Sequence, residues 1–304
     1  MNILIIYYSQ SGQLKSILDS ISEGFPTEVS IDYAEIVPEK GFSLPWSTDT
    51  FFDCMPECVL EIPEPIKPMK IANKNYDLII VGYQPWFLSP SLPITSFLKS
   101  EYASILKNKN IVTVVGSRNM WLNAQEKIKA SLKKHSANLL GNIVLFDRHP
   151  NVISLLTVMR WTFKGQKEAS KWLPEAGISQ KDILEAKKYG KIIFDFLNKK
   201  ESHSLQKQLL EAHAVEMKPS LIILEKRGIK NFRKFARYIH EKGSRGSLDR
   251  LPRVRLFKRL LTTIVFILSP ISNLTAQIQL LLQNRRLREE TNYFKEVSYK
   301  ENAI

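Results

Sequence analysis

The 304-residue chain contains only two cysteines, Cys54 and Cys58, and five histidines. A structural zinc site needs more ligands than two thiols, and no histidine stands near the cysteine pair. The sequence therefore predicts ordinary thiols in a reducing compartment and no metal site. No basic region precedes the first apolar run, which is too short for a secretory signal. These absences predict a protein that is made and kept in the cytoplasm.

The loop after that first run lacks two patterns that often mark nucleotide binding. It has neither the lysine of a P-loop nor the three glycines of the dinucleotide fingerprint, which disfavours an ATPase and a nicotinamide-binding Rossmann domain. Instead, a buried-strand pattern over 3–8 leads into a small, hydroxylic loop over 9–13 and a helical pattern from Leu14. Backbone N–H groups, the Ser9 and Ser11 hydroxyls and the helix dipole then meet at one point. This arrangement predicts a site for the single phosphate of FMN, with a capped helix that binds nothing as the alternative.

Further strand patterns alternate with helical patterns along the first two thirds of the chain. The strands are expected at residues 29–36, 76–82, 111–115 and 142–146. With the first strand they predict an α/β fold, a doubly wound sheet of five parallel strands, whose functional groups lie at the carboxyl ends of the strands. An amphipathic helix over 152–163 and a capped helix from Ser179 to about residue 198 complete this part.

Residues 38–69 interrupt this alternation with a stretch rich in proline and aromatic side chains. It is too apolar for a solvated linker and too rich in proline for a regular element. Long loops inside a compact domain are usually functional, so we expect an insertion that covers the substrate. The alternative is that its aromatic side chains only pad the edge of the sheet.

The C-terminal third carries most of the excess positive charge. Residues 218–260 contain 14 Lys and Arg against three Asp and Glu, whereas the whole chain has a net charge of +14. Apolar residues at helical spacing from Ile229 to Ile239 make this a basic amphipathic helix, typical of an anchor on an anionic membrane surface. The expected domains are therefore 1–200, with a mononucleotide site, and a helical, membrane-associating region over 201–304.

An uncharged, largely apolar stretch over 260–284 follows, with arginine on both sides. It is long enough to cross a bilayer of about 30 Å, but the positive residues at both ends favour a peripheral or monotopic segment at the inner face of the cytoplasmic membrane. Nucleic-acid binding is disfavoured because it leaves the apolar stretch without a burial partner. A homodimer, or packing on the first domain, is the remaining alternative.

Residues 1–200 resemble the flavodoxin-like FMN proteins. Their phosphate loop follows the pattern hydroxyl-x-hydroxyl-Gly-x-hydroxyl, which residues 9–13 match, although Leu14 stands where the last hydroxyl is expected. The loops after Gly82 and Gly116 correspond to the two that bracket the isoalloxazine ring. The resemblance, together with the loop chemistry, implies these FMN-binding residues: Ser9, Gln10, Ser11, Gly12, Gln13, Leu14, Gln84, Pro85, Trp86, Phe87, Gly116, Ser117, Arg118, Asn119 and Trp121.

Longer motifs resemble a bacterial family associated with dialkylresorcinol and flexirubin pigment synthesis. They span residues 7–14, 45–46, 51–53, 83–91 and 118–126. This family is often labelled a condensing enzyme, but a flavodoxin-like fold fits better with its other assigned role, an aromatase. A condensing enzyme needs a nucleophilic cysteine with histidine partners, whereas Cys54 and Cys58 lie in a proline-rich loop.

The resemblance implies an FMN-dependent oxidoreductase that dehydrogenates a lipophilic 2,5-dialkylcyclohexane-1,3-dione to a dialkylresorcinol. His149 is the candidate for proton transfer, and Arg118 for binding the enolate oxygen or the flavin pyrimidine. Trp86 and Trp121 are expected to stack on the flavin or frame the substrate, unless they only anchor their loops. An NAD(P)H-dependent quinone reductase, a flavodoxin-type electron carrier at the membrane, and a scaffold without FMN stay open.

Overall fold

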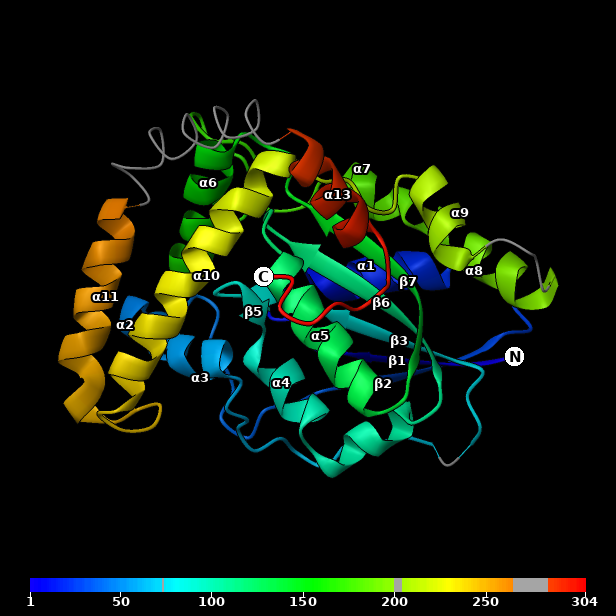
Figure 1. Ribbon diagram of the computed structural model, residues 1–304, viewed down its shortest axis with the longest axis horizontal. Helices are drawn as coiled ribbons and strands as arrows, with labels where there is room; N and C mark the ends of the chain where they lie inside the picture. The colour runs from blue at the N-terminus through cyan, green and yellow to red at the C-terminus, as the bar shows by residue number, and fades with distance from the viewer. Residues whose placement is uncertain (73, 200–203, 265–283) are drawn as a thin grey trace.

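The computed structural model describes residues 1–72, 74–199, 204–264 and 284–304 (Figure 1). Its centre is a sheet of five parallel strands in the order β2-β1-β3-β6-β7. The strands are β1 (Asn2–Tyr7), β2 (Ser30–Glu35), β3 (Leu78–Tyr83), β6 (Asn110–Ser117) and β7 (Asn138–Phe146). Counted along the sheet, this is the 2-1-3-4-5 order of the flavodoxin-like fold, so the predicted fold class is confirmed.

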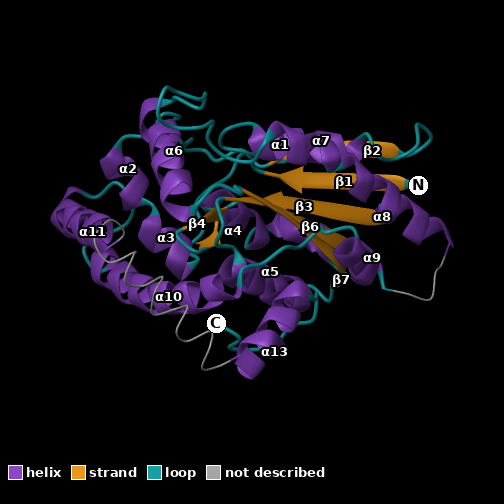
Figure 2. Ribbon diagram, turned by 90° about the horizontal axis from the view of Figure 1, so that it is seen from above, coloured by secondary structure: helices purple, strands orange, loops and turns teal. Residues whose placement is uncertain are grey.

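Successive side chains of the central strands point to opposite faces of the sheet, and each face has its own core. On one face, Ile3 and Ile5 of β1 pack under α1 (Gln13–Ser22), α7 (Gln180–Glu185), α8 (Lys187–Lys199) and α9 (Leu205–Glu211). On the other, Leu4 and Ile6 pack under α4 (Leu92–Leu98), the 3-10 turn η1 (Glu101–Leu106), α5 (Leu122–Lys134), α10 (Pro219–His240) and α13 (Asn284–Lys295). Figure 2 shows the sheet between these two layers.

Besides shifts of one or two residues at strand ends, the structure differs from the prediction in three places. β7 begins at Asn138 rather than at 142, with an irregularity in its register where Val112 pairs with Gly141. The single helix expected from 179 to about 198 is divided into α7 and α8. The loop after β3 contains a small hairpin of β4 (Pro85–Trp86) and β5 (Ser89–Pro90).

The prediction that residues 38–69 hold no regular element is wrong. Two short helices form there, α2 (Thr48–Asp53) and α3 (Met55–Leu60). Ser47 caps α2 by accepting a hydrogen bond from the Thr50 N–H, and Pro56 lies in the first turn of α3, where its missing N–H costs nothing. Proline here starts a helix rather than breaking one.

The C-terminal helices pack on this insertion. The apolar face of α10 is buried, because Ile229, Ala236 and Ile239 join one cluster with Met55 of α3 and with α11 (Leu251–Thr263). After a 3-10 turn, η2 (Leu248–Arg250), α11 lies against α2 (Figure 1). The apolar face of α10, on which a membrane anchor was expected, is therefore inside the molecule. This agrees with the alternative in which the C-terminal region packs on the first domain.

Basic side chains of the C-terminal region also pair with acidic side chains of the insertion. These pairs are Arg245 with Glu64, Arg250 with Asp53 and Glu57, and Arg255 and Lys258 with Asp49. No helix among the described residues is both long enough and apolar enough to span a membrane. The stretch predicted to dip into the bilayer, 260–284, lies for the most part outside those residues, as does the boundary expected near residue 200.

Candidate functional site

The predicted phosphate loop begins where β1 ends and opens α1. Gly12 is the N-cap of α1 with φ +80°, a left-handed conformation that suits glycine, and a Cβ there meets no atom within 4 Å. The N-cap provides no side-chain hydrogen bond to the first turn, although the Lys15 N–H lies 3.3 Å from Ser9 Oγ. Leu14 is buried in the core instead of facing the loop. The helix N-terminus is thus open above Gly12, as an anion site requires.

Two glutamines of this loop tie distant segments to it. Gln10 Nε2 donates to the carbonyls of Phe42 and Ser43, at 3.2 and 3.1 Å, and so holds the start of the insertion beside the loop. Gln13 exchanges two hydrogen bonds of 3.0 Å with the backbone of Ile178. Both amides, predicted to contact FMN, therefore also organise the rim of the site.

The second predicted loop is the β4-β5 hairpin. Its turn places Phe87 and Leu88 at φ 49° and 60°, which is unusual for large side chains. The Trp86 ring lies within 6 Å, between centroids, of Tyr8, Phe42 and Trp46. Trp86 thus belongs to an aromatic cluster that joins the end of β1 to the insertion, while the amide nitrogen of Gln84 is buried without a partner among the described residues.

The third loop follows β6 and is fastened to α6 (Asn151–Lys164). Arg118 Nη1 donates to the side-chain and backbone oxygens of Asn151, at 2.8 and 3.2 Å, and Asn119 Nδ2 donates to the same side-chain oxygen at 2.8 Å. Burial lowers the pKa of the Arg118 guanidinium to about 10 against the raising effect of Asp147, so the group is positive at neutral pH. Trp121, in contrast, is buried in the core beside α5.

His149, the predicted proton-transfer residue, is held by a carboxylate that the sequence analysis did not assign to the site. Asp147 Oδ1 accepts from the His149 backbone N–H at 3.0 Å and lies 2.7 Å from its Nδ1. Since a proton on Nδ1 satisfies that contact, Nε2 is left as the acceptor. The sequence pattern that could have identified Asp147 is an acidic residue directly after a buried strand and two positions before a histidine.

Several buried polar atoms near these strand ends have no hydrogen-bond partner within the described part of the chain. They are Gln84 Nε2, Ser117 Oγ, Asn119 Oδ1, Asp147 Oδ2 and Ser154 Oγ. Buried polar groups are almost always hydrogen-bonded in native proteins, so these atoms call for a polar partner from outside the described chain, such as a ligand or water. Donors and acceptors in this mixture fit the polar edge of a flavin mononucleotide.

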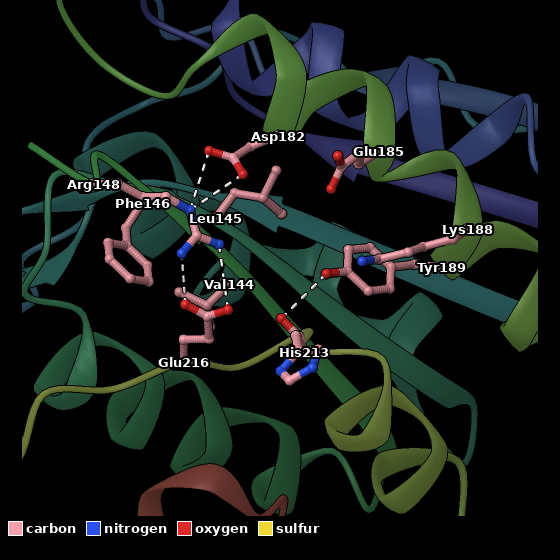
Figure 3. Close-up of a pocket in the computed structure, with 10 residues that line it drawn as sticks. All are labelled: Val144, Leu145, Phe146, Arg148, Asp182, Glu185, Lys188, Tyr189, His213 and Glu216. Atoms are coloured by element: carbon pink, nitrogen blue, oxygen red, sulfur yellow. Dashed lines mark hydrogen bonds and ion pairs between the residues drawn. The ribbon is translucent and has the colours of Figure 1, made fainter.

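One cavity in the described structure lies elsewhere. It measures about 220 Å³ and is bounded by the end of β7, by α7 and α8, and by His213 and Glu216 (Figure 3). Arg148 crosses it and pairs with Asp182 and Glu216. A smaller cavity of about 10 Å³ touches Asn119 and Trp121. Neither cavity is lined by any residue of 9–14 or 84–87.

The strand order and the three loops define an α/β protein of the flavodoxin-like fold.

No protein-family model and no curated protein matches the sequence. Among solved structures, a flavoprotein in complex with FMN from Lactobacillus acidophilus is similar at 18% identity, over 47% of this chain and 92% of that one, with a TM-score of 0.38. A flavodoxin, WrbA-like protein from Agrobacterium tumefaciens aligns at 14% identity, over 66% and 99%, also with a TM-score of 0.38. A flavodoxin from the domain Archaea aligns at 16% identity over 65% and 99%, with a TM-score of 0.35.

Proposed function

We propose that this protein is an FMN-dependent oxidoreductase, an aromatase that converts a 2,5-dialkylcyclohexane-1,3-dione to a dialkylresorcinol. The single observation that carries the cofactor assignment is the set of unpaired buried polar atoms after β3, β6 and β7, at the same edge of the parallel sheet as the open N-terminus of α1. The resemblance of the longer motifs to the dialkylresorcinol family suggests the substrate class.

In this proposal the phosphate is bound by the loop of Ser9, Ser11 and Gly12, where the backbone N–H groups and the dipole of α1 favour an anion. Gln84, Ser117 and Asn119 then offer their unpaired polar atoms to the rest of the mononucleotide. Bound oxidised flavin supplies a two-electron acceptor for one ring hydrogen of the dione, which leaves as hydride.

Side chains of the protein remove the second hydrogen as a proton and stabilise the negative charge of the enolate. His149 Nε2 takes the proton, because the contact between Nδ1 and Asp147 fixes the imidazole with Nε2 free. Arg118, positive and partly buried, stabilises the enolate oxygen of the 1,3-dione. Loss of one hydride and one proton, followed by tautomerisation, gives the aromatic resorcinol.

A dione with two alkyl chains partitions into lipid, since each buried methylene is worth about 0.8 kcal/mol. We therefore include an anionic membrane surface among the partners. The contact must use a surface other than the apolar face of α10, which is buried.

The test is anaerobic reduction of the purified protein. Addition of a dialkylcyclohexanedione is expected to bleach the flavin spectrum and to yield one resorcinol per flavin. Bleaching by NAD(P)H without any reaction of the dione identifies a quinone reductase instead. Electron transfer to a redox protein, with no turnover of either compound, identifies an electron carrier.

A further inference from the structure

α6 buries two polar side chains and leaves its apolar ones at least partly exposed. Ser154 and Thr157 are fully buried, whereas Val152 is 49% exposed. The remaining apolar side chains of the helix are each only partly buried: Ile153, Leu155, Leu156, Val158, Met159, Trp161 and Phe163. A surface helix normally turns its apolar stripe to the core and its polar residues outward. Two features of α6 therefore need an explanation: its buried polar side chains and its partly exposed apolar ones.

The candidate site explains why α6 turns polar side chains inward. Asn151, at the start of α6, accepts the hydrogen bonds of Arg118 and Asn119. Ser154, one turn further along, is one of the buried polar residues without a partner, and the Thr162 carbonyl accepts from the Trp46 N–H at 2.8 Å. α6 thus packs against the loop after β6 and against the insertion, both of which belong to the candidate site.

The outward side continues into the loop after α6 with a mixture of tryptophan and lysine. Trp172 is 83% exposed, far more than is usual for a tryptophan, and Lys171 Nζ lies 5.2 Å from its ring centroid. Lys167 Nζ lies 5.8 Å from the Trp161 ring and also pairs with Glu175. Residues 160–175 hold four basic and two acidic side chains. Exposed tryptophan beside lysine is the composition of a membrane interface, where the ring enters the headgroup region and the cation meets anionic lipid.

A second apolar stripe lies at the same end of the molecule. Leu256, Leu260 and Ile264, four residues apart on α11 and its continuation, are 43%, 39% and 46% exposed. In Figures 1 and 2, α6 and α11 both lie at the end opposite to the N-terminus. Exposed apolar side chains on α6 and α11 therefore lie at the same end of the molecule, and basic side chains lie on α6 and in the loop after it.

We propose that the outward face of α6, the side that carries Val152, together with Trp172 and the exposed lysines Lys164 and Lys171, docks on an anionic lipid surface and sets the candidate site against the bilayer. The lipid partner belongs to the proposed function, but the docking face is a separate claim. Vesicle binding, measured without substrate or turnover, tests it alone. If the catalytic proposal is wrong, vesicle binding through this face is still expected. If vesicle binding through this face fails, the catalytic proposal is unaffected.

The experiment measures binding of the full-length protein to vesicles of phosphatidylcholine with and without phosphatidylglycerol. The test variant is Val152→Ser with Trp172→Ala. The matched control is Leu184→Ser, a 62% exposed leucine on α7, which lies apart from α6 in both views. We expect the test variant to lower the affinity for phosphatidylglycerol vesicles by at least about tenfold, with no change for the control.

Lys164→Gln with Lys171→Gln is expected to remove most of the dependence on phosphatidylglycerol. Wild-type affinity in the Val152/Trp172 variant overturns the proposal, as does equal binding to vesicles with and without the anionic lipid. If the outward face of α6 is covered by another part of the chain or by a protein, the variant loses stability or partner binding and keeps its vesicle affinity. That outcome also overturns the proposal.

Discussion

Arg250 donates two hydrogen bonds to the carboxylate of Glu57, at 2.7 Å from Nη1 and 2.9 Å from Nη2, and its side chain is fully buried. Its Nε also donates to Asp53 at 2.5 Å. One side chain of the C-terminal region thus neutralises two buried acids of α2 and α3. This contact fixes the insertion to the last third of the chain.

Removing this guanidinium takes the arginine partner from two buried carboxylates, although His240 Nδ1 still lies 3.6 Å from Glu57 Oε1. We expect Arg250→Met to lower the free energy of unfolding by about 3–5 kcal/mol, as when one partner of a buried ion pair is lost. Arg255→Met is the control, because its pair with Asp49 is largely exposed and such pairs contribute about 0–1 kcal/mol. Urea unfolding of both variants measures the difference, and equal losses contradict the account.

Gly12 and Gly246 form a matched pair of glycines. Both have a positive φ, of 80° and 91°, and at both a Cβ meets no atom within 4 Å. Alanine at either position is therefore expected to cost about 1 kcal/mol of stability through the backbone alone. Only Gly12→Ala is expected to weaken FMN binding, by about tenfold or more, since its Cβ enters the space over the helix N-terminus. An unchanged FMN affinity in Gly12→Ala, or an equal loss in Gly246→Ala, is the contrary result.

Asp147 is a positioning residue for His149. We expect His149→Gln to lower kcat for the dione by about 10²–10⁴ and to leave the flavin content unchanged, because only proton transfer is lost. Asp147→Asn keeps an acceptor oxygen and is expected to lower kcat less. Single-turnover reduction under anaerobic conditions measures both variants. Loss of flavin from either variant shows that the pair supports the cofactor site instead.

Glu225 of α10 gives the fold a pH dependence. Its Oε1 accepts from the Asn123 N–H at 2.7 Å at the start of α5, and burial raises the pKa of this carboxyl to about 7 against the lowering effect of backbone hydrogen bonds. Between its ordinary value, near 4.5, and about 7, the folded state binds more protons than the unfolded state. The free energy of unfolding therefore falls as the pH rises through this window, by roughly 3 kcal/mol at most from this group.

Glu225→Gln removes the titration and keeps an oxygen for the Asn123 N–H. Urea unfolding at a series of pH values is expected to give a flatter profile between 4.5 and 7 for the variant than for the wild type. Identical slopes show that the carboxyl stays ionised in the folded protein.

The sheet could be predicted from the sequence because buried parallel strands are continuous apolar runs, and the residues after them stand out as small, polar or aromatic. What covers an apolar face could not be predicted. The spacing of Ile229 and Ile239 indicates an amphipathic helix, but only the fold shows that α3 and α11 bury that face rather than lipid. Periodicity likewise predicted the helix over 152–163 but not that Ser154 and Thr157 are the side turned inward.

The insertion shows a second limit. Counting prolines predicted an irregular loop, although the position of Pro56 in the first turn of α3 is a favourable one for proline. The acids that stabilise α2 and α3 there, such as Asp53, find their basic partners almost 200 residues away along the chain. Local propensity carries no information on contacts at that separation.

The proposed roles of Arg118 and His149 both require that the loop around Gly12 binds the phosphate of a mononucleotide. The most direct measurement is a fluorescence titration of flavin-free protein with FMN and, in parallel, with riboflavin, which lacks the phosphate. We expect one FMN to bind per chain, at least about 100-fold more tightly than riboflavin, because several N–H groups hydrogen-bond the phosphate. Equal affinity for the two, or binding of neither, contradicts the account.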